Sequence, residues 1–172
     1  MPSQLRPVAE FVLCGSDSAS CYGIFDNLVV VLGGAPPNAA NVQLFSSIVK
    51  GLAAKYPKGA GILIAVQPDS TPTPDGREAL LAMFREVRSS VSSAFVLESS
   101  GFATAAQRAI ITAMLLVTPF RDSIRIERSV EAGAGWLSAR VPSSTGQAWD
   151  EASLARAARA FCQLRTAHRR SA

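Results

Sequence analysis

The sequence is poor in the residues that most often carry chemistry. Its 172 residues include one histidine, His168, and three cysteines, Cys14, Cys21 and Cys162, none of them in a Cys-x-x-Cys pair. A catalytic histidine needs an orienting partner and a rigid mount, whereas His168 lies near the C-terminus among arginines. An odd number of scattered cysteines fits neither a disulfide framework nor a zinc site. We therefore expect no catalytic histidine, no metal centre and no structural disulfide.

Long apolar runs and strong charge are also missing. The longest apolar runs, such as 28–32 and 62–66, have the length of strands, whereas a membrane-spanning helix needs about 20 apolar residues. The first ten residues lack the basic-then-apolar order of a signal peptide. Charged residues make up 17 % of the chain and hydrophobic residues 48 %, a balance that favours a packed globular domain over disorder. We expect a soluble cytoplasmic protein without a membrane span.

Glycine-rich phosphate-binding motifs are missing as well. Gly33-Gly34 follows an apolar run and precedes a helical pattern, but no third glycine stands at the required offset. Pro36-Pro37 removes backbone N–H donors that a phosphate would need. We predict a turn at this point, and no nucleotide or other cofactor.

What the sequence does contain is a regular alternation of strand and helix patterns. Short runs rich in β-branched and aromatic residues predict strands, and these are 10–15, 20–25, 28–32, 62–66, 94–97 and 124–127. Apolar residues at helical spacing predict helices, and these are 38–56, 75–91, 101–117, a short helix after Ser129 and a last helix from Asp150. The run 62–66 is apolar on both faces, as in a central strand covered by helices, whereas 124–127 alternates like an edge strand.

This order predicts an α/β fold with a mixed β-sheet. The first strands form an antiparallel N-terminal part, and the later ones form βαβ units whose right-handed crossovers place helices over the sheet. We expect residues 1–8 to be an N-terminal tail, 9–141 the α/β domain, 142–149 a linker and 150–172 an extra Ala- and Arg-rich C-terminal helix. The apolar stripe of that helix packs either on its own sheet or on a second copy in a homodimer. Trp149, in the polar linker, is a candidate anchor for a partner.

The order and lengths of these elements resemble the STAS and SpoIIAA-like fold family of anti-sigma-factor antagonists. Leu28-Val-Val-Val-Leu32, with the hairpin before it, looks like the family's opening strands, and 38–56 looks like its first helix. Ile62-Leu-Ile-Ala-Val66, the loop after it and Arg77-Glu-Ala-Leu-Leu-Ala-Met-Phe84 are similar to its central strand, phosphoacceptor loop and second helix. Ile124-Arg-Ile-Glu127, followed by 129–137, resembles its last strand and closing helix. The resemblance implies a regulatory module that binds a protein partner.

The loop after the central strand departs from the family's pattern. The family's switch is a serine in an Asp-Ser-Ser-Gly type turn at the start of the second helix. In this chain the corresponding loop reads Asp69-Ser-Thr-Pro-Thr-Pro-Asp-Gly76, so that turn is not intact. Ser70, Thr71 and Thr73 are the candidate phosphoacceptors, and Asp75 is expected to cap the helix. We do not carry the phosphoswitch over to this chain.

A serine pair further along looks locally like the family's turn. Glu98-Ser99-Ser100-Gly101 follows a predicted strand and opens a helix. If this turn were the family's switch, only one strand and one short helix would follow it before the linker, whereas the family has more elements there. The element order therefore assigns it to the third helix. Backbone N–H groups at a helix start favour an anion, but a serine there also serves as a cap. Both interpretations of Ser99 and Ser100 stay open.

Three classes of function follow from these patterns. The first is a non-catalytic protein–protein interaction or regulatory module that uses the loops at the carboxyl ends of the strands. The alternative is a small-ligand binder or an enzyme that uses the same loops, with Asp75 and Glu98 as an acid–base pair. The second alternative is binding of an anionic surface or nucleic acid by the arginines of the C-terminal helix. We expect the first, with a protein partner and no enzymatic activity, and nucleic acid is the least expected partner.

Overall fold

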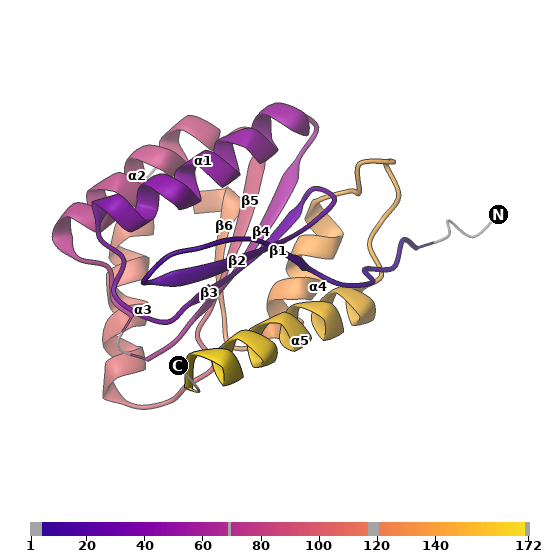
Figure 1. Ribbon diagram of the computed structural model, residues 1–172. Coiled ribbons are helices and arrows are strands. Elements are labelled where there is room, and N and C mark those ends of the chain that lie inside the picture. The colour runs from indigo at the N-terminus through magenta and orange to yellow at the C-terminus, as the bar shows by residue number, and fades with distance from the viewer. Residues whose placement is uncertain (1–4, 69, 117–120, 171–172) are drawn as a thin grey trace.

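The computed structural model describes residues 5–68, 70–116 and 121–170, apart from the side chains of residues 115, 121 and 165–170. These residues form a six-stranded mixed sheet with helices on both faces (Figure 1). The first two strand pairs are antiparallel, and the remaining pairs are parallel. This arrangement confirms the predicted α/β fold, with its antiparallel N-terminal part, its βαβ units and its extra C-terminal helix.

The strands lie in the sheet in the order in which they occur in the chain. They are β1 (Val12–Ser16), β2 (Ser20–Phe25), β3 (Leu28–Gly33), β4 (Ala60–Val66), β5 (Val91–Val96) and β6 (Ile124–Glu127). A turn at Asp26-Asn27 joins β2 to β3, and Asp26 has a φ of 54° there. Since each strand pairs with its sequence neighbour, β1 and β6 form the two edges, as predicted for β6.

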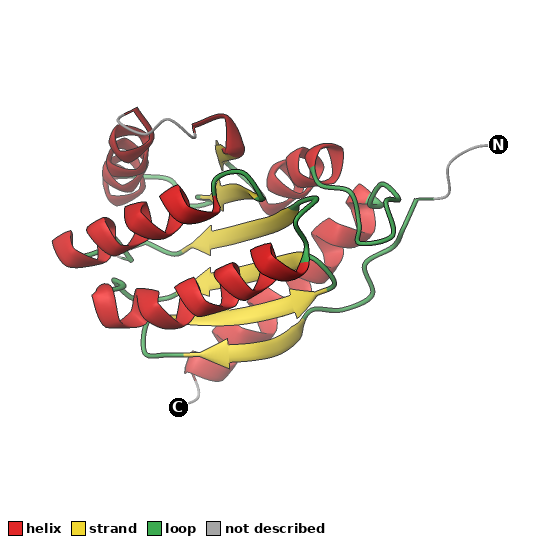
Figure 2. Ribbon diagram, turned by 90° about the horizontal axis from the view of Figure 1, so that it is seen from above, coloured by secondary structure: helices red, strands yellow, loops and turns green. Residues whose placement is uncertain are grey.

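The helices cover the two faces of the sheet in separate groups. They are α1 (Ala39–Lys55), α2 (Pro74–Val87), α3 (Phe102–Leu116), α4 (Val130–Arg140) and α5 (Glu151–Arg170), with a short 3-10 turn at Arg121–Ser123. Helices α1, α2 and α3 contribute to one apolar core, whereas α4 and α5 contribute to the other. Figure 2 shows α1 and α2 side by side over one face of the sheet, roughly along the strands. Successive right-handed crossovers in one direction explain why α1, α2 and α3 share a face.

Strand β4 contributes to both cores. Ile62 and Ile64 point to the core under α1 and α2, and Leu63 points to the core under α4 and α5. All three are buried. This alternation is the structural basis of the continuous apolar run in the sequence, and it confirms the prediction of a central strand covered on both faces.

The C-terminal helix packs on its own sheet. Leu154, Ala158 and Phe161 are 1 %, 0 % and 4 % exposed, and they share a core with Val30 of β3. Gly23 of β2 makes room for the Phe161 ring, because a Cβ at Gly23 would stand 2.6 Å from that ring. Of the two positions predicted for this apolar stripe, the structure therefore has the one on its own sheet.

Residues 5–8, the described part of the predicted tail, pack against the predicted linker. The Arg6 N–H donates to the Ala148 carbonyl (2.8 Å), and the Asp150 N–H donates to the Arg6 carbonyl (2.9 Å). Trp149 is 2 % exposed, with the Arg6 guanidinium 5.2 Å and the Phe25 ring 5.9 Å from its ring centroid. Trp149 is thus a core residue rather than an exposed anchor, because the N-terminal segment, far away in sequence, covers it.

The pairing of Arg6 with Asp26 makes the stability of the fold depend on pH. Burial raises the pKa of Asp26, but hydrogen bonds from Ser144 and the charge of Arg6 outweigh it and hold the pKa below its ordinary value. A carboxyl of this kind stabilises the fold above its unfolded pKa and loses that effect as the pH falls through its folded pKa. We therefore expect Asp26→Asn to be destabilised at neutral pH and to approach the wild type toward about pH 3. Urea unfolding at both pH values measures this, and a difference independent of pH would contradict it.

Candidate functional site

The carboxyl ends of β3, β4 and β5 meet along one side of the sheet, as they must in parallel strands. We call this side the carboxyl edge and define it by the loops 34–38, 67–73 and 97–101. Hydrogen bonds join the loops to one another and to α3, for example from the Gln67 N–H to the Gly33 carbonyl (3.1 Å) and from Gln107 Nε2 to the Gln67 carbonyl (3.0 Å). All the predicted site residues except Trp149 lie in these loops or directly after them.

The candidate phosphoacceptors of loop 67–73 differ in accessibility. Ser70 is 4 % exposed, and its hydroxyl donates to the Gln67 carbonyl (2.6 Å). Thr73 is the N-cap of α2, and its Oγ1 accepts a hydrogen bond from the Gly76 N–H (3.3 Å). Thr71 is half-buried, and Asp69 lies outside the described residues. The hydroxyls of Ser70 and Thr73 therefore have structural partners in this loop.

Asp75 stabilises the start of α1 instead of capping α2, which corrects the sequence prediction. Pro74 occupies the first position of α2, where a backbone N–H has no partner within the helix, so the missing N–H of proline loses no hydrogen bond. The N-cap is therefore the residue before it, Thr73. The Asp75 carboxylate accepts hydrogen bonds from Thr73 Oγ1 (2.6 Å) and from the Ala39 N–H (2.9 Å). These hydrogen bonds hold the pKa of Asp75 below its ordinary value. The side chain thus links the first turns of two neighbouring helices.

Glu98 forms its hydrogen bonds on the face of the sheet that α4 and α5 cover, opposite the face covered by α1 and α2. Its Oε1 accepts hydrogen bonds from the Val130 N–H at the start of α4 (3.1 Å) and from Arg159 Nη2 (2.8 Å). The same guanidinium pairs with Glu131 (2.7 Å), whose pKa its hydrogen bonds lower. The predicted acid–base pair of Asp75 and Glu98 is therefore divided between two separate hydrogen-bond networks.

The serines before α3 are placed differently from each other. The Ser99 hydroxyl accepts a hydrogen bond from Thr104 Oγ1 (3.0 Å), a buried side chain of the first turn. Ser100 is exposed. Gly101 follows with a φ of 110°, which favours glycine, and turns the chain into the helix. Ser99 thus fixes the start of α3, and Ser100 remains on the surface of the carboxyl edge.

An open cleft of about 450 Å³ lies at the carboxyl edge on the α5 side, and residues from β3, β4, the loops and α5 line it. Its polar side chains include Glu98, Ser99, Arg159 and Cys162. Burial, and to a smaller extent the charge of Glu98, raises the pKa of the Cys162 thiol to about 12. Since the thiolate is the nucleophilic form, Cys162 is a thiol rather than a nucleophile at neutral pH.

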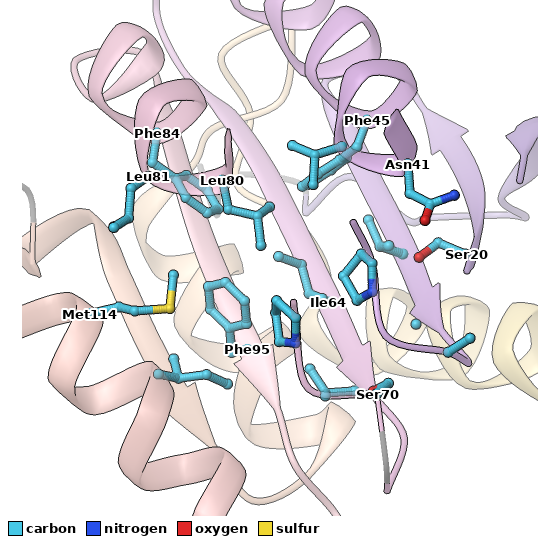
Figure 3. Close-up of a pocket in the computed structure, with 18 of the residues that line it drawn as sticks. Ser20, Asn41, Phe45, Ile64, Ser70, Leu80, Leu81, Phe84, Phe95 and Met114 are labelled. Carbon is cyan, nitrogen blue, oxygen red and sulfur yellow. The ribbon is translucent and has the colours of Figure 1, made fainter. Parts of the chain in front are cut away.

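A second cavity lies inside the other core, between the sheet and α1, α2 and α3 (Figure 3). Its volume is about 80 Å³, counted as the space open to the centres of water-sized spheres. Its apolar lining includes Phe45 of α1, Leu80 of α2, Phe95 of β5 and Met114 of α3. The sequence predicts these residues as ordinary core positions. Periodicity shows which side chains face inward, but it does not show whether they fill the space between them.

Phe102, the first residue of α3, has the most exposed large apolar side chain among the described residues. Phe102 is 91 % exposed at the carboxyl edge, beside Ser100 and Gly101. Its spacing from Ala106 and Ile110 is helical, so the pattern alone would place it inward. It is exposed because α3 begins at this edge. Leu116, the last residue of the helix, is 72 % exposed.

In the described part of the chain, no three His, Cys, Asp or Glu residues are grouped so that they could hold a metal ion. No helix within those residues combines the length and apolarity needed to cross a membrane. Arg159 is engaged with two glutamates, and the side chains of the last arginines and of His168 lie outside the described residues.

Comparisons with protein-family models, with curated proteins and with solved structures found no significant match for this chain. The α/β fold, with its six-stranded mixed sheet, its antiparallel first strands and its later βαβ units, is therefore shown by the structure alone.

Proposed function

We propose that this chain is a non-catalytic interaction module that binds a protein partner at the carboxyl edge, with Phe102 as the anchor. One observation carries the proposal: an aromatic ring that is 91 % exposed stands directly after loop 97–101 of the carboxyl edge. Aromatic side chains supply a large share of the binding energy in protein interfaces, and they do so near the centre of the contact. A fully hydrated ring on an otherwise packed domain is therefore the side chain that gains most from a partner.

The resemblance to the STAS and SpoIIAA-like family supports the same proposal. Antiparallel strands followed by βαβ units and a closing helix form the order on which the resemblance was based, and the structure has this order. Under this proposal the module acts by binding, with the loops after β4 and β5 as the contact surface. Thr71 is the half-buried candidate for regulation by phosphorylation, since Ser70 is buried and Thr73 is a cap.

Binding of a small ligand in the cleft at Glu98 and Arg159 is the second candidate. The observation that favours it is the open volume of about 450 Å³ at the carboxyl ends of the strands, where α/β sheets place their sites. The charged side chains of that cleft, Glu98 and Arg159, are already paired, however, because Arg159 binds Glu98 and Glu131. A charged ligand would have to break this network, which ranks this function below partner binding.

The proposal predicts that a charge at position 102 abolishes capture of the partner. Tagged wild-type protein and Phe102→Asp are used as baits in a lysate of the source organism, and bound proteins are quantified by mass spectrometry. We expect one stoichiometric protein to be lost by at least about tenfold in the variant, because an anchor aromatic contributes 2 kcal/mol or more.

Leu116→Asp is the matched control. It lies on the same helix, is similarly exposed, and stands about 20 Å away by the helical rise. Capture by this variant should equal that of the wild type, and both variants should unfold at the wild-type temperature because the positions are exposed. Equal losses at positions 102 and 116, or a partner that binds Phe102→Asp as well as the wild type, would contradict the proposal.

A further inference from the structure

The cavity between the sheet and α1, α2 and α3 is an unfilled volume in the apolar core on that face of the sheet. Protein interiors reach the packing density of organic crystals and contain few voids larger than a water molecule. A single water needs about 10–15 Å³ by this kind of measure, and the cavity offers about 80 Å³. The space therefore suffices for a group larger than one water molecule.

The walls of this cavity are apolar. Val31, Ile64 and Phe95 form its floor on the sheet, and Leu80, Phe84 and Ile111 enclose it from α2 and α3. None of the described residues that line it carries a charged side chain. A buried water needs two to four polar partners, and such walls do not provide them in the interior. The cavity is therefore better suited to an apolar molecule than to a cluster of waters.

The polar groups of the cavity are few and already engaged. Figure 3 shows Ser20 and Asn41 close together in one part of the lining and Ser70 in another, while Met114 reaches in from α3. Ser70 donates to the Gln67 carbonyl (2.6 Å). Asn41 Oδ1 accepts from the Asn38 N–H (3.2 Å), while Asn41 Nδ2 donates to Ser18 Oγ (3.1 Å). A charged ligand would consequently be buried without a counter-charge, at a large free-energy cost.

We propose that this cavity binds a small uncharged apolar molecule, of the class of a single aromatic ring or a short alkyl chain. The walls exclude charge, the volume limits size, and apolar cavities in proteins accept such ligands without a dedicated polar contact. The unbranched, polarisable Met114 side chain on α3 adjusts its shape to an occupant. This site does not depend on Phe102 or on a partner protein.

The test uses toluene as the probe and the isoleucine methyl groups of the whole chain as reporters. In a titration followed by methyl NMR, we expect saturable shifts at the cavity residues Ile64, Ile111 and Ile124. Ile48 and Ile126 belong to the same core but do not line the cavity, so their shifts should be several-fold smaller. Shifts that grow linearly without saturation, or that are equal at all five residues, would overturn the proposal.

Two matched variants and a charged analogue complete the test. Ile111→Phe fills the cavity from α3 and should weaken toluene binding at least tenfold, whereas Ile110→Phe, the same change one residue earlier and outside the lining, should leave binding unchanged. Benzoate has the same ring with a charge and should bind at least tenfold more weakly than toluene. Equal affinity of wild-type protein for toluene and benzoate would overturn the proposal, and this comparison needs no variant to fold.

Discussion

Replacing Gly76 by alanine should lower the free energy of unfolding by about 3 kcal/mol, because nothing near this position can yield cheaply. A Cβ at Gly76 would stand 2.2 Å from the carbonyl oxygen of Pro37 and 3.1 Å from Thr73 Oγ1. The first of these is a backbone atom, so relief requires the starts of α1 and α2 to move apart. That movement would also break the hydrogen bonds from the Ala39 N–H to Asp75 and from Thr73 Oγ1 to the Pro37 carbonyl.

Gly51→Ala is the control for this prediction, and it should have the opposite sign. Gly51 lies inside α1 and is exposed, and beyond its chain neighbours and the adjacent backbone of its own helix no atom lies within 4 Å of an added Cβ. Alanine is favoured over glycine within a helix, so the variant should gain about 0.5–1 kcal/mol. Chemical denaturation of both variants provides the measurement. A Gly76→Ala protein within 1 kcal/mol of the wild type would show that the two helix starts are not held as described.

Truncation of Phe161 to alanine should cost about 3–5 kcal/mol, the usual range for a buried phenylalanine. The side chain is 4 % exposed and packs against Gly23 of β2, in the core that α5 shares with α4 and the sheet. The expected loss reflects both the apolar area returned to water and the cavity left between α5 and β2. It tests whether the C-terminal helix belongs to the domain of its own chain.

Leu164→Ala, one turn further along α5, is the matched control. Leu164 is 64 % exposed, and removal of an exposed side chain changes stability by no more than about 0.5 kcal/mol. Unfolding in urea at two protein concentrations measures both variants. If Phe161→Ala lost its stability only at low protein concentration, the helix would pack on a second copy in solution, and the packing described above would be contradicted.

The fold was predictable because its signals are local. Alternating β-branched runs and helical spacings identified the six strands and five α-helices of the described residues, and β4 was recognised from its apolar run. Boundaries were less accurate where small residues enter strands. β4 begins at Ala60 and β5 at Val91, earlier than predicted, because Gly61 pairs with Leu28 and with Ser92 in the ladder. Sheet pairing overrides the weak strand preference of such residues.

The site was less predictable because it depends on contacts between distant segments. The sequence predicts that Trp149 is an exposed linker residue, whereas in the structure the Arg6 guanidinium lies over its ring. The sequence predicts that Asp75 caps α2, whereas its carboxylate accepts a hydrogen bond from the start of α1. Phe102 fits the inward stripe of α3 by spacing, and only the position of the helix start at the carboxyl edge leaves it exposed. No pattern within ten residues of these positions carries that information.

Site-specific photocrosslinking at Phe102 tests the central claim, partner binding at the carboxyl edge, most directly. The photoreactive analogue p-benzoylphenylalanine is placed at position 102 in one sample and at position 116 in another, and cells of the source organism are irradiated. The account predicts a discrete adduct with a different protein from position 102 and none from position 116, although both side chains are exposed. No adduct from position 102, or the same adducts from both positions, would contradict it.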